Sequence, residues 1–358
     1  MARGLLAARR RARRLAAGGC LTLLERLGYK PSTALIVPFV PPVAGRLAAM
    51  LQAADHENLN YALRRLHPDS VAGTLAALID VLERTESRAR WLERLWQWYR
   101  GQRDIHSMSA LIVGLLHEAR ASHQRKTLAA LPARRQEGIA EDLAEAERLL
   151  DKACQQQPGN AELLALRLQT ARYLALPPSE HWARFRLLLA VDAEHFRGHL
   201  LMLENLGPDW YGSAEAMFRF ARARAAQVPT HHPLHGLPIY AHFAMHRRHL
   251  TAEEAAAEQW FAQPDVAIEV LEIWESLRES LALPGRLHED ELLNLLAGAL
   301  YLSGHSLQAG EALTIMDGRC LPIPWCQMAV NDREAHNPGW VVDRIRAEIA
   351  EKSSANSQ

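Results

Sequence analysis

Six of the 17 histidines in the chain fall within one stretch of 19 residues, at 231–249. Imidazole is the commonest metal ligand among protein side chains. If the second part of this stretch is a helix, His242, His246 and His249 lie on one face at the i, i+4 and i+7 positions. No carboxylate lies within that face, and two arginines stand between His246 and His249, which disfavours a divalent cation. Two hypotheses therefore stay open here: hydrogen-bonded structural histidines, and a metal-binding or metal-dependent enzyme module at 231–249.

No other spacing in the chain predicts a reaction. Cys320 and Cys326 are separated by five residues, two of them prolines, and His336 follows ten residues later. This spacing does not match a zinc knuckle, so we expect a proline-rich strap over the last helices. The sequence also lacks the Gly-x-Ser-x-Gly elbow of hydrolases and the glycine loop and lysine that bind phosphates. We therefore predict no catalytic residue, no cofactor and no enzymatic activity.

The charge balance disfavours a nucleic-acid partner. The chain has 41 Lys and Arg residues against 41 Asp and Glu residues, whereas a protein that neutralises phosphates needs an excess of cations. A weaker alternative is nucleic-acid binding through the basic segments at 3–14 and 120–135. Trp91 and Trp98 alternate with arginines, as in a base-stacking surface, but they also share a helical face, which favours core packing. We therefore expect no nucleic acid among the partners.

The sequence predicts neither a membrane span nor an export signal. No apolar run approaches the roughly 20 residues that cross a bilayer. Four cysteines without a Cys-x-x-Cys pair fit a reducing compartment, so we expect a cytoplasmic protein. Six arginines lie within the first 24 residues, but no apolar region follows them, and four prolines occupy 31–42. We therefore expect residues 1–43 to be a basic segment followed by an extended strap.

From residue 44 onward the sequence is typical of helices. Leu, Ala, Glu, Arg and Gln dominate, β-branched residues are sparse, and apolar residues recur at i, i+3, i+4 and i+7. Short turns with proline, glycine or serine separate helices of ten to twenty residues, as in helical hairpins packed side by side. We predict helices at 44–54, 57–66, 71–84, 88–100, 103–120, 138–157, 161–175, 180–191, 193–206, 213–227, 238–248, 251–262, 264–282, 288–303, 306–317 and 339–351.

The second half of the chain contains a period. The helix-breaking turns at Pro158, Asp192, Pro229 and Pro264 are 34, 37 and 35 residues apart. This spacing is close to the 34-residue period of tetratricopeptide repeats, whose helix pairs bury their apolar faces against their neighbours. We therefore predict an all-α fold, a tetratricopeptide-like superhelix of stacked helical hairpins. The expected parts are the basic segment and strap at 1–43, irregular helices at 44–135, repeats at 136–318, and a strap with a capping helix at 319–358.

The stretch at 208–222 resembles an uncharacterised bacterial family of tetratricopeptide-like helical-repeat proteins, a domain of unknown function. Members of that family contain Pro-x-Trp-Gly-Gly-Ser followed by Glu, Met and Phe-Ala-Arg. The matching residues here are Pro208, Trp210, Gly212, Ser213, Glu215, Met217, Phe220, Ala221 and Arg222, and Tyr211 replaces the first glycine. The resemblance extends over about 45–320 and implies the fold, but it implies no chemistry.

The residue types within this motif predict local roles. Gly212 relieves a turn, Ser213 caps the following helix, and Glu215 lies near the positive end of that helix. We expect Met217, Phe220 and Ala221 to face the core. The predicted partner or ligand surface consists of Trp210, Tyr211, Ser213, Glu215 and Arg222.

These observations together favour a non-catalytic scaffold or adaptor of the helical-repeat type. We expect such a protein to bind an unidentified peptide or protein in the concave groove of the array, by analogy with other helical-repeat folds. The alternative is the metal-dependent module at 231–249.

Overall fold

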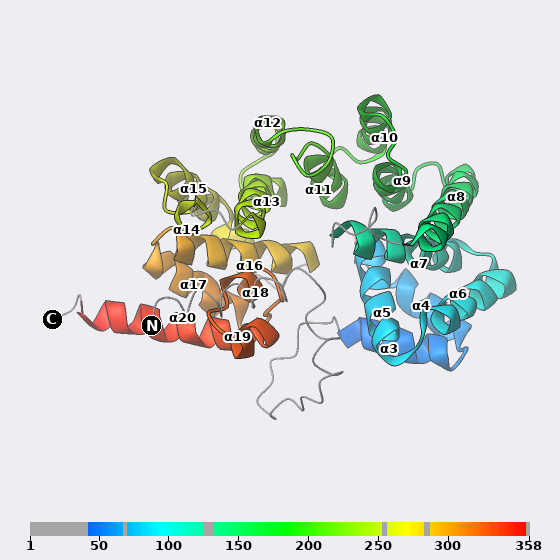
Figure 1. Cartoon of the computed structure of the whole chain (residues 1–358), viewed down its shortest axis with the longest axis horizontal. Coiled ribbons are helices and arrows are strands. Elements are labelled where there is room, and N and C mark those ends of the chain that lie inside the picture. The colour runs from blue at the N-terminus through cyan, green and yellow to red at the C-terminus, as the bar shows by residue number, and fades with distance from the viewer. Residues whose placement is uncertain (1–41, 67–69, 125–131, 253–255, 283–286, 356–358) are drawn as a thin grey trace. The chain divides into compact units, whose positions relative to one another are not determined.

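The computed structural model describes residues 42–66, 70–124, 132–252, 256–282 and 287–355. Within these ranges every regular element is a helix and no strand occurs, which confirms the all-α prediction. The helices form two compact units, an N-terminal unit that ends at Asn205 and a C-terminal unit that starts at Leu206 (Figure 1). No helix in the described ranges combines the length and apolar character needed to cross a bilayer. The predicted segment at 1–43 lies almost wholly outside the described residues.

The N-terminal unit consists of helices that follow one another along the chain. They are α3 (Pro42–Gln52), α4 (His56–Arg64), α5 (Val71–Thr85), α6 (Arg88–Gln102), α7 (Ile105–Gln124), α8 (Ala133–Gln156), α9 (Ala161–Tyr173), α10 (Pro178–Val191) and α11 (Phe196–Asn205). Asp55 and Asn160 cap α4 and α9 by accepting hydrogen bonds from backbone amides in the first turn.

Helix α7 packs against both α5 and α6. The apolar face of α6 is buried through Trp91 and Trp98, which confirms core packing for these two tryptophans. Gly114 of α7 permits this contact, because a Cβ at that position would lie 2.6 Å from Leu95 Cδ1 and 3.3 Å from Trp91 Cζ3. The small residue therefore sets how closely α7 approaches its neighbours.

The second part of the N-terminal unit is organised around α9, which packs against α8, α10 and α11. Arg184 of α10 links three of these helices. Its guanidinium donates to Glu147 of α8 at 2.5 Å and to the Arg167 carbonyl of α9 at 2.8 Å. Because Arg184 is buried and its charge has a carboxylate partner, these hydrogen bonds fix the three helices relative to one another.

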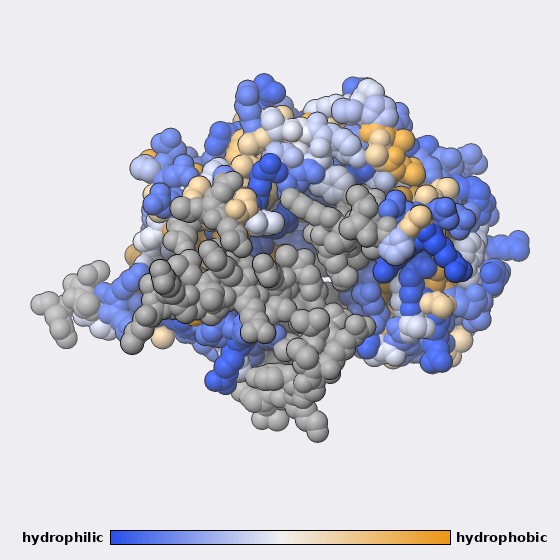
Figure 2. Space-filling model, in the orientation of Figure 1, coloured by the Kyte–Doolittle hydropathy of each residue, from blue (hydrophilic) through white to orange (hydrophobic). Residues whose placement is uncertain are grey.

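Helix α10 also has an apolar side that remains in solvent. Leu187 and Val191, one helical turn apart, are 55% and 43% exposed. In Figure 2, hydrophobic surface lies in the region of α10. Side chains of this size normally pack in a core. Their exposure on adjacent turns makes this face of α10 an exposed apolar patch.

The C-terminal unit contains the remaining helices. They are α12 (Ala214–Ala225), the 3₁₀ helix η3 (Pro233–Gly236), α13 (Leu237–Thr251), α14 (Ala256–Gln259), α15 (Pro264–Leu281), α16 (Leu287–Leu302), α17 (Ser306–Met316), α18 (Trp325–Met328), α19 (Asp332–His336) and α20 (Pro338–Ala355). Helix α16 packs against α13, α15 and α17, and α20 packs against α17, α18 and α19.

Asn294, which is fully buried in α16, fixes the proline-containing stretch after α17. Its amide nitrogen donates to the Arg319 carbonyl at 2.8 Å. Its amide oxygen accepts from the Leu321 backbone amide at 3.0 Å and from the Trp325 indole at 2.8 Å. One side chain therefore satisfies polar groups along the segment that connects α17 to α18.

The predicted helix start at Thr251 is wrong. The sequence Thr251-Ala-Glu-Glu254 has the pattern of a capping box and predicts a helix start at Thr251. In the structure Thr251 is instead the last residue of α13, and its hydroxyl donates to the Arg247 carbonyl one turn earlier at 2.8 Å. The pattern misleads because a threonine hydroxyl also bonds backward along its own helix.

Candidate functional site

The turn before α12 has the local structure that the motif at 208–222 predicts. Ser213 caps α12, with its hydroxyl accepting from the Ala216 amide at 3.1 Å. A Cβ at Gly212 would lie 2.1 Å from the Leu206 carbonyl oxygen, so the close approach of two backbone segments requires glycine there. Met217 and Phe220 are buried. The motif therefore has a clear structural role in starting α12.

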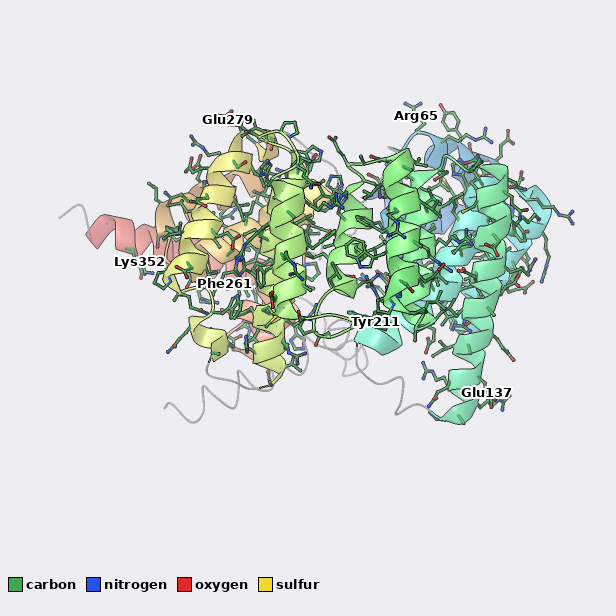
Figure 3. The ribbon with its side chains drawn as sticks, turned by 90° about the horizontal axis from the view of Figure 1, so that it is seen from above. Arg65, Glu137, Tyr211, Phe261, Glu279 and Lys352 are labelled. Carbon is green, nitrogen blue, oxygen red and sulfur yellow. The ribbon has the colours of Figure 1, made fainter. Side chains whose placement is uncertain are left out.

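The predicted surface residues of this motif lie around the same turn and helix. Tyr211 lies on the turn that precedes α12 (Figure 3). The rings of Trp210 and Tyr211 contact each other with centroids 6.2 Å apart, and both side chains are half-buried. Glu215 lies 3.7 Å from Arg219 on the exposed face of α12. Arg222 differs from the others because its partner comes from a distant helix.

Arg222, Glu269, His242 and Trp260 form a continuous hydrogen-bonded chain from the surface into the C-terminal unit. The Arg222 guanidinium donates to both carboxylate oxygens of Glu269, at 2.7 and 2.8 Å. His242 Nε2 lies 2.9 Å from the second of these oxygens. The Trp260 indole nitrogen lies 3.3 Å from His242 Nδ1. Two residues that the sequence assigned to different hypotheses, Arg222 and His242, thus meet on one carboxylate.

The partners of His242 fix its tautomer. An indole N–H only donates, so Nδ1 of His242 accepts from Trp260, and Nε2 then donates to Glu269. Burial raises the pKa of Glu269, but the hydrogen bonds from Arg222 and His242 outweigh this effect and lower the pKa to about 2. Both ring nitrogens of His242 are therefore engaged, and Glu269 is a stable anion. This arrangement suits a structural role better than proton transfer or metal ligation.

The other two predicted metal ligands contact aromatic rings. The ring centroid of His246 lies 5.4 Å from that of Phe261, and the ring centroid of His249 lies 5.0 Å from that of Trp260. Among the described residues, His242, His246 and His249 do not form a group whose ligand atoms could share one ion. The metal prediction for these histidines gains no support from this geometry.

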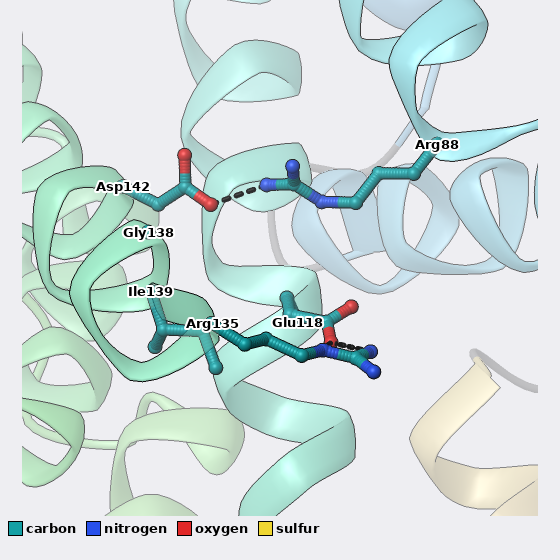
Figure 4. Close-up of a pocket in the computed structure, with 6 residues that line it drawn as sticks. All are labelled: Arg88, Glu118, Arg135, Gly138, Ile139 and Asp142. Atoms are coloured by element: carbon teal, nitrogen blue, oxygen red, sulfur yellow. Dashed lines mark hydrogen bonds and ion pairs between the residues drawn. The ribbon is translucent and has the colours of Figure 1, made fainter. Parts of the chain in front are cut away.

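A small pocket of about 270 Å³ lies in the N-terminal unit between α6, α7 and α8 (Figure 4). Its lining consists of Arg88, Glu118, Arg135, Gly138, Ile139 and Asp142. The charged groups pair with each other, Arg88 with Asp142 and Arg135 with Glu118. Burial raises the pKa of Asp142 in spite of the Arg88 charge. The pocket is smaller than typical ligand sites, which are roughly 300–1,000 Å³, and its two arginines and two carboxylates are already paired.

A second polar cluster, which the sequence did not predict as a site, connects α5 and α7. Asp80, Glu83 and His117 each place one ligand atom within 4.8 Å of the others. The i, i+3 spacing of Asp80 and Glu83 was visible in the predicted helix at 71–84. His117 is remote in sequence, and nothing in the local pattern predicts that α7 turns this ring toward α5.

Comparison of the chain with models of protein families, with curated proteins and with solved structures finds no match. The resemblance of 208–222 to an uncharacterised bacterial family stays a prediction. The residues of this chain are therefore the basis for its functional assignment.

Proposed function

We propose that the protein is a non-catalytic scaffold that binds a protein or peptide partner through its helical array. The observation that supports this proposal most directly is the exposed apolar face of α10. Leu187 and Val191 form this face, one turn apart, and lie beside the part of α10 that is buried through Phe185 and Leu188. Exposed apolar side chains that extend the buried face of a helix are common where a partner covers them.

The packing of α9 supports a tetratricopeptide-like arrangement for this part of the chain. In such repeats the first helix of a pair packs against its own second helix and against the first helix of the next pair. Helix α9 packs against α10 and also against α11. Pro158 and Asp192, 34 residues apart, stand before α9 and α11. We therefore propose that α9 and α10 form one repeat and that α11 begins the next.

The partner that fits this face presents apolar side chains on a helix or an extended peptide. Leu187 and Val191 offer no hydrogen-bonding groups, so burial of apolar area supplies the binding energy. The turn at Trp210 and Tyr211 offers a second half-exposed aromatic surface on the C-terminal unit. Partner binding at Trp210, Tyr211, Ser213, Glu215 and Arg222 remains part of the proposal.

The test is partner capture with the full chain. We expect an affinity-tagged protein, purified from its native cells, to retain a reproducible partner near one-to-one. The double substitution Leu187→Asp and Val191→Asp should lower the affinity for that partner by about 30-fold or more, because buried anchors at protein interfaces contribute about 2 kcal/mol or more.

Leu307→Asp is the matched control. Leu307 is 79% exposed and lies on α17 of the C-terminal unit, so its replacement adds a charge without touching α10. Retention of the partner by the double α10 variant, or equal loss in the Leu307 variant, would overturn the assignment of the α10 face.

A further inference from the structure

The packing of α7 against α5 brings together three side chains with the chemistry of a cation site. His117 Nε2 of α7 lies 3.1 Å from Glu83 Oε2 of α5, and His117 Nδ1 lies 3.8 Å from Asp80 Oδ1. Asp80 and Glu83 are one helical turn apart, so they project from the same side of α5. One nitrogen and two carboxylates thus converge within the N-terminal unit.

The imidazole is the fixed part of this cluster. The His117 side chain is only 5% exposed, and the ring of the fully buried Trp91 packs against it at an angle of 83° with centroids 5.8 Å apart. Nε2 lies 3.1 Å from Glu83 Oε2 without forming a hydrogen bond. A buried ring nitrogen without a hydrogen bond normally costs free energy, and a cation held between Nε2 and the carboxylates would offset that cost.

Arg120 supplies a positive charge to the cluster in the structure. Its guanidinium donates to Asp80 at 2.6 Å and lies 3.2 Å from His117 Nδ1. The groups that face one another are therefore two carboxylates, one guanidinium and one imidazole. Asp80 and Glu83 together carry two negative charges, and Arg120 offsets one of them. Arg120 and a divalent cation compete for the Asp80 carboxylate.

We propose that Asp80, Glu83 and His117 form a binding site for a divalent cation of the first transition row. His117 ligates through Nε2 and each carboxylate through one oxygen. Imidazole with carboxylates favours Zn²⁺ or Mn²⁺ over Ca²⁺, which prefers oxygen ligands alone. Three protein ligands leave at least one coordination position for water.

Cation binding also changes the partner of Arg120. When Nε2 ligates the ion, the imidazole proton resides on Nδ1, which then cannot accept a hydrogen bond from Arg120. The guanidinium therefore leaves His117, and its contact with Asp80 weakens. Both carboxylates are about half exposed and can adjust their rotamers around the ion, while the buried ring stays in place.

Isothermal titration of the chelator-treated full chain with ZnCl₂ and with MnCl₂ tests this proposal. We expect a saturable site that Glu83→Gln weakens by about tenfold or more, since even loss of a supporting group around a metal commonly costs 10–100-fold in affinity. Asp80→Asn should act in the same direction. MgCl₂ should bind more weakly than either ion.

Arg120→Gln separates site chemistry from general charge. Removal of the competing guanidinium should tighten binding, whereas Arg84→Gln, which removes an exposed arginine next to Glu83 in sequence, should leave the affinity unchanged. Circular dichroism of each variant verifies that the fold is retained. Because Glu83 is half exposed, Glu83→Gln disturbs the fold less than a substitution of the buried His117.

Three results would overturn the proposal. They are no saturable binding of either ion to the wild type, an unchanged affinity in the Glu83 variant, and equal tightening in the Arg84 and Arg120 variants. The last result would show that bulk charge, rather than these ligands, controls binding. The site is separate from the α10 face, so either proposal can fail while the other holds.

Discussion

At the residue scale, the hydrogen-bonded chain of Arg222, Glu269, His242 and Trp260 depends on the negative charge of Glu269. Its carboxylate accepts from the exposed Arg222 and from the buried His242. Loss of the anion leaves the Nε2–H of His242 facing a weaker acceptor inside the protein, which is more costly than loss of a surface ion pair. Glu269 therefore links the surface of α12 to the interior of α13.

We expect Glu269→Gln to lower the free energy of unfolding by about 1–3 kcal/mol. Glutamine retains the shape and one acceptor but loses the charge. Urea denaturation at pH 7 measures the change. Glu272→Gln, an exposed substitution on the same helix, is the control and should stay within about 0.5 kcal/mol of wild type.

The same residue predicts an acid dependence. Its folded pKa of about 2 lies below the ordinary value of 4.5, so its stabilisation is fully present above pH 4.5 and disappears as the pH falls toward 2. The full effect is at most about 3 kcal/mol, and solvent screening of the exposed Arg222 reduces it. Glu269→Gln should lose less stability than wild type over this interval. An equal loss of stability with falling pH in the wild type and in Glu269→Gln would contradict this assignment.

The local roles of single residues could be predicted from the sequence, whereas the pairing of residues that are distant in sequence could not. Ser213 as the cap of α12 and the burial of Met217 depend on helix geometry within a few residues, and the structure confirms both. The pairing of Glu269 with Arg222 spans 47 residues. From the sequence alone, Arg222 could pair with any of many carboxylates. Only the packing of α12, α13 and α15 brings Arg222 and Glu269 together.

At the element scale, the close approach of α7 to α6 positions His117 as well as the core. Gly114→Ala should lower the free energy of unfolding by about 1–3 kcal/mol, because the added methyl overlaps Leu95 and Trp91. This loss should appear despite the gain in helix propensity of about 1 kcal/mol. Thermal and urea denaturation measure it.

Gly138→Ala in α8 is the matched control. A Cβ at Gly138 meets no atom within 4 Å, so the same substitution should stabilise the protein by about 0.5–1 kcal/mol. Equal effects of the two substitutions would show that propensity, and not packing, determines the outcome at Gly114.

The segment between α17 and α18 depends on Asn294 in a comparable way. Asn294→Ala leaves the Leu321 amide and the Trp325 indole without an acceptor, so we expect a loss of about 3 kcal/mol or more. Asn58→Ala removes an exposed asparagine from α4 and should change stability by less than about 0.5 kcal/mol. A small effect at Asn294 would mean that the segment keeps its place by apolar contacts alone.

At the scale of the whole molecule, each unit has its own buried core. The N-terminal unit buries Trp91, Trp98 and Phe185, and the C-terminal unit buries Trp274 and Trp325. We expect a fragment of residues 40–205 to be helical and to unfold cooperatively when expressed alone, which circular dichroism with urea denaturation tests. A fragment without a cooperative transition would contradict the division into units.

The helical class and most helix ranges were predictable because each helix has its own apolar period. The predicted ranges at 71–84 and 264–282 agree with α5 and α15 to within one residue at each end. The short helices α18 and α19 were not predicted. Their positions depend on tertiary partners such as Asn294, which a local pattern does not contain.

Cys320 is buried within the segment that Asn294 holds, so its thiol is a natural reporter of that segment. Burial raises its pKa to about 12, so the thiolate that reacts with alkylating reagents is almost absent at neutral pH. Cys320 becomes reactive when the segment detaches and water reaches the sulfur. The alkylation rate at this position, read by peptide mass spectrometry, therefore measures how often the last part of the chain opens while the rest stays folded.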